Sequence, residues 1–250
     1  VVSEAHYGLG LVYRQQSSYE DARSHLQQAL AAAERLGDLQ HEARVLNALG
    51  SVANLERDFV TATELFTKAL QIRETIGDRV GIGASLTSLA QAYGNMGDYS
   101  QVALLLAQAL EMQQAMSNRW EEMLILNELG ILYTTVGQYN TAFGYLEHAI
   151  DSSRAIESEI GLAYILCNLG QAQRDAGRLD EAKQTLIEGL LLAQHQGDVT
   201  LEAIYLSDAA MTNLRAGKYA AAREQAERSL EIFEQLQQPL SSTGVYATLS

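Results

Sequence analysis

The chain has 250 residues, with 17 Lys or Arg against 31 Asp or Glu, a formal net charge of −14. Hydrophobic residues make up 47% and charged residues 19%, which excludes a disordered chain, and the single cysteine, Cys167, excludes an internal disulfide. Negative charge repels phosphate backbones and anionic lipids, so we expect neither nucleic-acid nor membrane-surface binding.

A repeat of 40 residues runs through the sequence. A small residue recurs at one position of every repeat, and an aromatic residue follows nine positions later in five of six repeats. The small residues are Gly10, Gly50, Ala90, Gly130, Gly170 and Ala210, and the later column reads Tyr19, Phe59, Tyr99, Tyr139, Leu179 and Tyr219. Because the chain has one proline, the repeats predict helices joined by short turns.

Each repeat contains the pattern of two amphipathic helices. In the second repeat, Leu46, Leu49 and Ala53 share one face of a first helix, and Ala62 and Phe66 share one face of a second. A glycine inside the first helix costs about 1 kcal/mol relative to alanine, which predicts that another backbone approaches closely there. The aromatic residue is expected to plug the start of the second helix.

Glycines also recur at the helix boundaries. Gly37-Asp38, Gly77-Asp78 and Gly197-Asp198 each end a second helix and offer an aspartate to the first helix of the next repeat. Glycine favours the left-handed conformation that follows a helix, and aspartate is a preferred N-cap. These dipeptides therefore predict sharp turns between repeats.

The repeat resembles the tetratricopeptide repeat, whose pattern is W-x₂-L-G-x₂-Y followed by A-x₃-F. The first part appears here as Leu126-x₂-Leu129-Gly130-x₂-Tyr133, and the second as Ala62-x₃-Phe66. The 40-residue length is similar to the long variants of kinesin light chains, spindle-orientation adaptors and bacterial signal-transduction ATPases and their regulator relatives. This sequence departs from the family pattern in its repeat length, in the residue at the tryptophan position and in the absence of the closing proline.

This resemblance implies an all-α fold, a tetratricopeptide α-solenoid that forms a right-handed superhelix of six helix-turn-helix repeats plus a partial seventh. We expect one solenoid domain over residues 1–250 and a chain that is a piece of a larger protein. The expected repeat units are 1–38, 39–78, 79–118, 119–158, 159–198 and 199–238, followed by a partial helix at 241–250.

No arrangement of residues predicts an enzyme. His41-Glu42 lacks the second histidine of a zinc-protease helix, and the five histidines share no metal-binding spacing. We interpret His6 as a packing residue, the other histidines as lying on solvated helix faces, and Cys167 as a small packing residue. The chain is therefore expected to be non-catalytic, with no cofactor and no metal.

In a tetratricopeptide array the first helices line the concave side. The family's usual positions predict a face of amides, hydroxyls and balanced charges, which suits an extended peptide backbone. The best candidates for ligand binding are Tyr7, Arg14, Arg44, Asn47, Asn54, Gln91, Asn127, Glu128, Tyr164, Asn168, Gln171, Arg174 and Arg215. The same face is expected to hold Glu4, Ile131, Thr134, Thr135, Cys167, Asp175 and Asp208.

These features predict a protein-protein interaction module that binds a peptide or protein surface on the concave face, as the sensor or scaffold segment of a larger signalling protein. The partner is a protein or peptide, or another domain of the same parent chain. One alternative is a structural, self-assembling solenoid, and another is a small-molecule effector-binding domain of a transcription regulator. We expect a cytoplasmic protein that is a monomer or associates weakly end to end.

Overall fold

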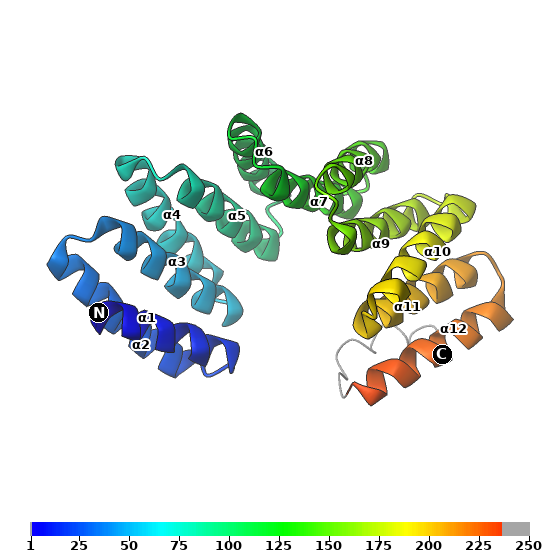
Figure 1. The fold of residues 1–250 in the computed structure, drawn as a ribbon, viewed down its shortest axis with the longest axis horizontal. Helices are drawn as coiled ribbons and strands as arrows, with labels where there is room; N and C mark the ends of the chain where they lie inside the picture. Colours follow the sequence, from blue (N-terminus) through cyan, green and yellow to red (C-terminus); the bar gives the residue numbers. More distant parts are fainter. Residues whose placement is uncertain (1, 237–250) are drawn as a thin grey trace. The chain divides into compact units, whose positions relative to one another are not determined.

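The computed structural model describes residues 2–236, and this part of the chain consists of twelve α-helices joined by turns, with no strand (Figure 1). The helices are α1 (Val2–Gln15), α2 (Tyr19–Leu36), α3 (Leu39–Leu55), α4 (Phe59–Ile76), α5 (Arg79–Met96), α6 (Tyr99–Ala115), α7 (Arg119–Thr135), α8 (Tyr139–Ala155), α9 (Glu159–Asp175), α10 (Leu179–Gln196), α11 (Val199–Arg215) and α12 (Tyr219–Gln235). The all-α helical-repeat fold is thus confirmed. The partial helix expected at 241–250 lies outside the described residues.

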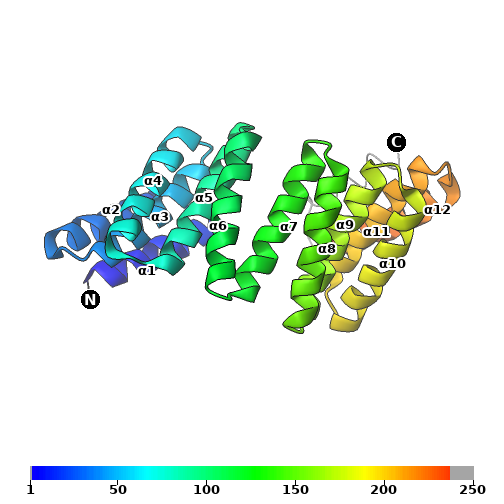
Figure 2. The same cartoon turned by 90° about the horizontal axis from the view of Figure 1, so that it is seen from above.

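The chain divides after Ser117 into two compact units. Unit 1 contains α1 to α6, and unit 2 contains α7 to α12. Within each unit, the two helices of a pair pack together and each second helix packs against the first helix of the next pair. Figure 2 shows the helices of each unit lying side by side.

The boundaries between helices follow the predicted glycine and aspartate positions. Gly37 and Gly77 end α2 and α4 in the left-handed conformation, with φ of 65° and 71°. The carboxylate of Asp38 accepts a hydrogen bond from the backbone N–H of His41 at 3.0 Å, and Asp198 caps α11 in the same way at 2.9 Å. These turn predictions are confirmed, because the conformation and the cap depend on residues only a few positions apart.

The small residues inside the first helices make room for a side chain rather than for a backbone. A Cβ atom on Gly50 would lie 2.7 Å from Cε1 of Phe66, and one on Gly170 would lie 2.6 Å from Cδ2 of Leu186. Each glycine thus packs against a large side chain from the second helix of the same repeat. The expected close approach is present, but the atoms that approach belong mainly to side chains.

The aromatic residues at the starts of the second helices are less buried than a plug would be. Tyr99 is 41% exposed and Tyr219 is 71% exposed, whereas Tyr19, Phe59 and Tyr139 are half-buried. The plug interpretation is therefore wrong for Tyr99 and Tyr219. The apolar core instead lies between the helices, where residues such as Ala22 and Leu26 are fully buried.

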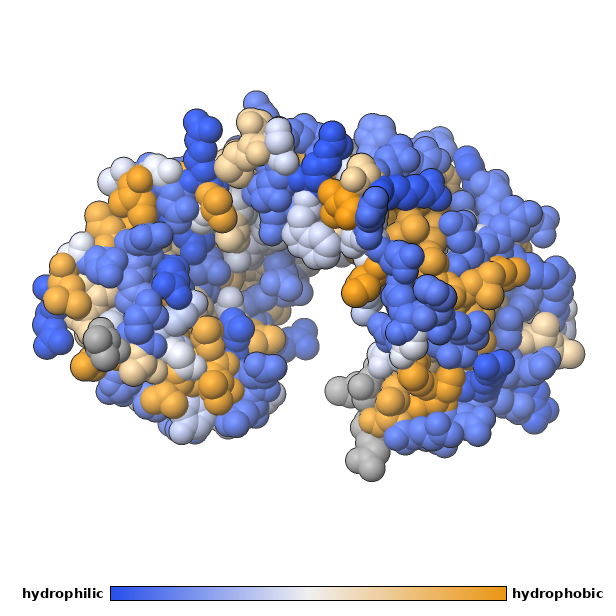
Figure 3. Space-filling view, viewed as in Figure 1, coloured by the Kyte–Doolittle hydropathy of each residue, from blue (hydrophilic) through white to orange (hydrophobic). Residues whose placement is uncertain are grey.

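The first helices of successive pairs lie next to one another in each unit: α1, α3 and α5 in unit 1, and α7, α9 and α11 in unit 2. We call the surface that these helices form the A-helix face of that unit. Figure 3 shows that hydrophilic residues dominate the visible surface of each unit, with hydrophobic side chains between them. The candidate residues all lie on the first helices.

Candidate functional site

The most connected polar group on the A-helix face of unit 2 is Asp208, which is buried on α11. Its Oδ1 accepts a hydrogen bond from Nη1 of Arg174 at 2.7 Å. Its Oδ2 accepts from Nε2 of Gln171 at 2.7 Å and from the thiol of Cys167 at 3.3 Å. One carboxylate of α11 therefore fixes three side chains of α9.

A second carboxylate, Asp175, completes this network at the end of α9. Its Oδ1 lies 3.0 Å from Nη1 of Arg215 and 3.3 Å from Nε of Arg174. Arg215 also donates to the backbone carbonyl of Arg174 at 3.0 Å. Two arginines and two aspartates are thereby interlocked across α9 and α11, and their formal charges cancel.

The expected charge balance of the face is realised largely as ion pairs between successive first helices. In unit 1 the Arg44 guanidinium lies 3.1 Å from Oε1 of Glu4, and in unit 2 the pairs described above join α9 to α11. The shielded pair of Arg174 and Asp208 keeps both side chains in fixed positions. A ligand would meet an ordered polar surface on these helices.

A cavity of about 420 Å³ opens beside this network, and we call it the face cavity. Three of its lining residues, Asn168, Gln171 and Arg215, were predicted as ligand contacts. The complete lining is Ile131, Thr134, Thr135, Tyr139, Asn168, Gln171, Asp175 and Arg215. Sequence reasoning had placed all of these except Tyr139 on the expected face.

Asn127 and Asn168 pair with each other on neighbouring helices. Nδ2 of Asn168 donates to Oδ1 of Asn127 at 2.8 Å, which joins α9 to α7. Asparagine at these positions was predicted to hold a ligand backbone. Asn168 lines the face cavity, whereas Asn127 does not and contributes by holding the side chain of Asn168.

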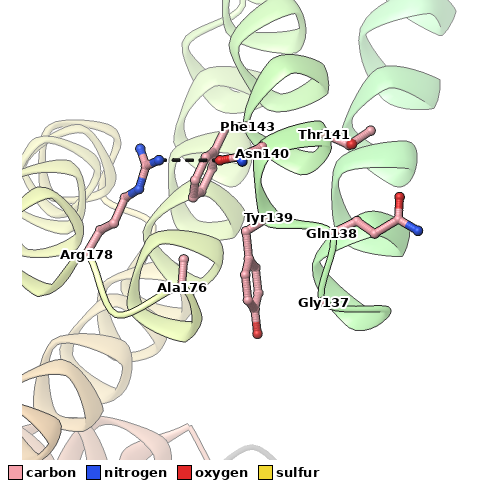
Figure 4. Close-up of a pocket in the computed structure, with 8 residues that line it drawn as sticks. All are labelled: Gly137, Gln138, Tyr139, Asn140, Thr141, Phe143, Ala176 and Arg178. Atoms are coloured by element: carbon pink, nitrogen blue, oxygen red, sulfur yellow. Dashed lines mark hydrogen bonds between the residues drawn. The ribbon is translucent and has the colours of Figure 1, made fainter.

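A second cavity of about 410 Å³ lies at the start of α8, and we call it the edge cavity. Figure 4 shows the guanidinium of Arg178 beside the ring of Phe143 and the carboxamide of Asn140. The guanidinium carbon lies 4.5 Å from the ring centre, and Nη2 lies 3.5 Å from Oδ1 of Asn140. Tyr139 lines both the face cavity and the edge cavity.

The predicted residues of unit 1 form separate, smaller contacts. The Arg44 guanidinium lies 4.9 Å from the ring centre of Tyr7. Asn47 donates to the Ser88 hydroxyl at 3.4 Å. Two further predicted residues, Asn54 and Gln91, lie on α3 and α5, where Asn54 accepts a hydrogen bond from Asn95 and Gln91 is exposed.

Three predicted residues stand apart from both cavities. Arg14 is half-buried near the end of α1, and Tyr164 is 48% exposed on α9. Burial raises the pKa of Glu128 on α7 from its ordinary value of 4.5 to about 7, and Glu121 on the same helix adds to this effect. None of the three lines the face cavity.

The histidine interpretation needs correction. His41 is buried on α3, where the ring of Tyr7 meets it edge-on at 5.5 Å between ring centres. His25 is half-buried and its ring stacks on that of Tyr13. Both were expected on solvated helix faces, whereas His148 and His195 are exposed as predicted. His6 contacts His25, in keeping with a packing role.

The chemistry of Cys167 agrees with its interpretation as a packing residue. The side chain is buried in a cluster with Ala163, Leu186 and Tyr205. Burial raises the pKa of its thiol, and the nearby Asp208 carboxylate raises it further. A nucleophilic cysteine needs a lowered pKa, so the environment of Cys167 opposes that role.

The family model of the tetratricopeptide repeat matches residues 1–75, 42–115, 121–194 and 161–235. The chain belongs to the tetratricopeptide repeat family. No curated protein matches the chain as a relative. The repeat model covers nearly all of both units, which explains the helix pairs and the recurring small residues.

Solved structures share the fold of this tetratricopeptide protein at low identity. The signal-transduction ATPase with a tetratricopeptide repeat sensor from Pyrococcus horikoshii is 14% identical with a TM-score of 0.82, over 98% of this chain and 38% of that one. A kinesin light chain repeat protein from Podosopora anserina is 21% identical with a TM-score of 0.66, over 77% and 96%. A Rap protein solved with Competence and Sporulation Factor is 17% identical with a TM-score of 0.68, over 98% and 72%.

Two further features bear on the classes of function. Within residues 2–236, no group of three or more histidine, cysteine, aspartate or glutamate side chains is arranged to hold a metal ion. None of the twelve helices described has the length and apolar character needed to cross a membrane.

Proposed function

We propose that this tetratricopeptide protein is a non-catalytic interaction module, and that the A-helix face of unit 2 binds an extended peptide segment of a partner protein. The partner segment belongs to another protein or to another part of the parent chain. The proposal concerns α7, α9 and α11, because three predicted residues, Asn168, Gln171 and Arg215, line the face cavity there.

The observation that carries this proposal is the face cavity. Its volume of about 420 Å³ falls within the range of about 300–1,000 Å³ typical of ligand sites. Its wall combines amides, hydroxyls and an ion pair with the apolar side chains of Ile131 and Tyr139. An extended peptide offers alternating N–H and C=O groups along with side chains, which such a wall can bind.

The order of the polar groups also favours binding. Gln171, Arg174 and Arg215 are held by carboxylates on neighbouring helices before any ligand arrives. Side chains that are already fixed lose less conformational entropy on binding, which raises affinity. A surface of freely rotating side chains would lack this advantage.

The similar proteins support the same class of function. The Rap structure contains Competence and Sporulation Factor, and the Pyrococcus horikoshii structure is described as having a tetratricopeptide repeat sensor. By analogy, we place the present chain as the sensor or scaffold segment of a signalling protein.

Photo-crosslinking tests the proposal directly. Benzoylphenylalanine at position 131, inside the face cavity, is compared with the same residue at position 187 on α10. The two isoleucines are a matched pair, because Ile131 is 43% exposed and Ile187 is 48% exposed. The bait is the full chain in lysate of the source organism, and the adducts are mapped by mass spectrometry.

We expect position 131 to crosslink to one defined segment of a partner, and position 187 to crosslink to that segment at a much lower level. Loss of the adduct when Asn168→Ala is added would strengthen the result. Equal labelling at both positions, or no adduct at position 131, would refute binding at this face.

A further inference from the structure

Four residues that line the face cavity offer hydrogen-bond acceptors, beside the N–H and O–H donors of Arg215, Asn168 and Tyr139. Two threonine hydroxyls on α7 have already donated their protons within their own helix. Thr134 donates to the carbonyl of Gly130 at 2.8 Å, and Thr135 donates to the carbonyl of Ile131 at 2.9 Å. Toward the cavity, each hydroxyl oxygen therefore offers only lone pairs.

The same reasoning fixes the orientation of Gln171. The carboxylate of Asp208 can only accept hydrogen bonds, so Gln171 must turn its Nε2 amide nitrogen toward that group, at 2.7 Å. The carbonyl oxygen Oε1 of Gln171 is left without a partner among the described residues. Gln171 thus adds an acceptor whose position is set by a buried residue of the next repeat.

Asp175 supplies a further acceptor, and this one carries charge. Both arginine contacts of Asp175 are made to Oδ1, by Nη1 of Arg215 and Nε of Arg174. Oδ2 has no partner among the described residues, and the side chain is 31% exposed. The four residues that carry these oxygens, Thr134, Thr135, Gln171 and Asp175, all line the face cavity.

We propose that the face cavity binds the basic side chain, lysine or arginine, of a partner peptide; this inference rests on the proposed function. An ammonium group carries three N–H donors and a guanidinium group carries five, and neither group accepts a hydrogen bond. The apolar side chains of Ile131 and Tyr139 cover the methylene groups of such a side chain. A carboxylate side chain in the same position would be repelled by the charge of Asp175 and could not bind the threonine and glutamine oxygens, which only accept.

Arg215 does not oppose a basic side chain. Its Nη1 is bound to Asp175 and to the carbonyl of Arg174, and the charges of Arg174 and Arg215 are cancelled by Asp175 and Asp208. The chain as a whole has a net charge of −14, which attracts basic peptides over longer distances.

Peptide display tests this inference. A random 12-residue peptide library is selected on the full chain, on Asp175→Asn and on Asp151→Asn. The third protein is the matched control, since Asp151 is an exposed aspartate on α8 that lines neither cavity. Melting followed by circular dichroism checks that all three proteins are folded.

We expect peptides selected on the wild type and on Asp151→Asn to share lysine or arginine at one position, and Asp175→Asn to lose this preference. In a selected peptide, norleucine at that position keeps the methylene stem and removes the charge. Losing a hydrogen bond to a charged group should weaken binding to the wild type about tenfold. On Asp175→Asn the two peptides should differ by less than about threefold.

Thr135→Val provides a second variant, because it removes one acceptor from an exposed side chain without altering an ion pair. It should reduce the preference for the basic peptide about threefold, less than the loss of Asp175, because the cationic side chain keeps its charged partner and loses one uncharged acceptor. Selected peptides without a shared basic residue would overturn the inference and leave the proposed function standing. A library from which no peptide is selected would overturn both.

Discussion

The missing side chain of Gly189 leaves the space that the Tyr205 side chain occupies, so replacing Gly189 by alanine should destabilise unit 2. A Cβ atom at Gly189 would meet three atoms of the Tyr205 side chain within 2.5 Å. Tyr205 has no room to move, because it is fully buried and its hydroxyl donates to the backbone carbonyl of Ala163. Overpacking of this kind lowers the free energy of unfolding by about 3 kcal/mol at the upper end of its range. The higher helix propensity of alanine raises it by about 1 kcal/mol. The expected net loss is about 2 kcal/mol.

The preceding repeat provides the natural replacement pair. The equivalent positions, 40 residues earlier, hold Ala149 and Ile165. Tyr205→Ile alone should cost about 3 kcal/mol, through the cavity that it leaves and the lost hydrogen bond. Because alanine fills part of that cavity, the double variant should be more stable than the sum of the two changes predicts, by about 2 kcal/mol.

Urea unfolding, followed by circular dichroism, measures these effects as shifts of the midpoint. Gly144→Ala on α8 is the matched control, since a Cβ atom there would meet nothing within 4 Å. That control should gain up to about 1 kcal/mol from helix propensity. A stable Gly189→Ala variant, or single effects that add within about 0.5 kcal/mol, would show that the two side chains do not compete for space.

Three further predictions follow from individual residues of unit 2. Burial raises the pKa of Glu128 from 4.5 to about 7, so the folded state binds a proton more tightly than the unfolded state. The free energy of unfolding should therefore fall as the pH rises from about 4.5 to about 7, by roughly 1–3 kcal/mol, and Glu128→Gln should remove this dependence in urea titrations at pH 5 and pH 8. An unchanged dependence in that variant would contradict the assignment. Gln138 precedes α8 and provides no side-chain cap, whereas Asp58 and Asp98 cap the second helices α4 and α6 of unit 1. Gln138→Asp should raise the thermal midpoint through a gain of about 1 kcal/mol, and a lowered midpoint would count against the capping argument. Burial raises the pKa of the Cys167 thiol, so iodoacetamide at pH 8 should label the native protein slowly and the urea-unfolded protein rapidly. Equal labelling rates would show that the thiol is accessible in the native state.

The sequence predicted the turns between repeats because they depend on local chemistry, whereas the packing role of the aromatic column was wrong for Tyr99 and Tyr219. Gly37 and Asp38 determine a turn and a cap within four residues of chain. The contact between Gly50 and Phe66 recurs at the same spacing in other repeats, although a backbone, not a side chain, was expected beside this glycine.

The details of the candidate site could not be predicted because they depend on side-chain geometry between repeats. The sequence placed Asp208, Gln171 and Asp175 on one face, but it did not indicate which oxygen atoms remain free. Tyr139 was missed as part of the cavity, since the aromatic column suggested a packing role at a helix start. His41 was misplaced because its burial depends on Tyr7 in the preceding repeat.

The pairing of Gly189 with Tyr205 limits how this protein can change by gene rearrangement. Gly189 belongs to the fifth repeat and Tyr205 to the sixth. A duplication or exchange of whole repeats would therefore separate these two residues, which must match each other in size. A sixth repeat moved next to any of the first four would bring Tyr205 against an alanine at the position of Gly189. Arg73 and its acceptor Ser85 are divided in the same way between the second and third repeats. The repeats therefore resemble one another without being interchangeable, and the order of the repeats is part of what each sequence encodes.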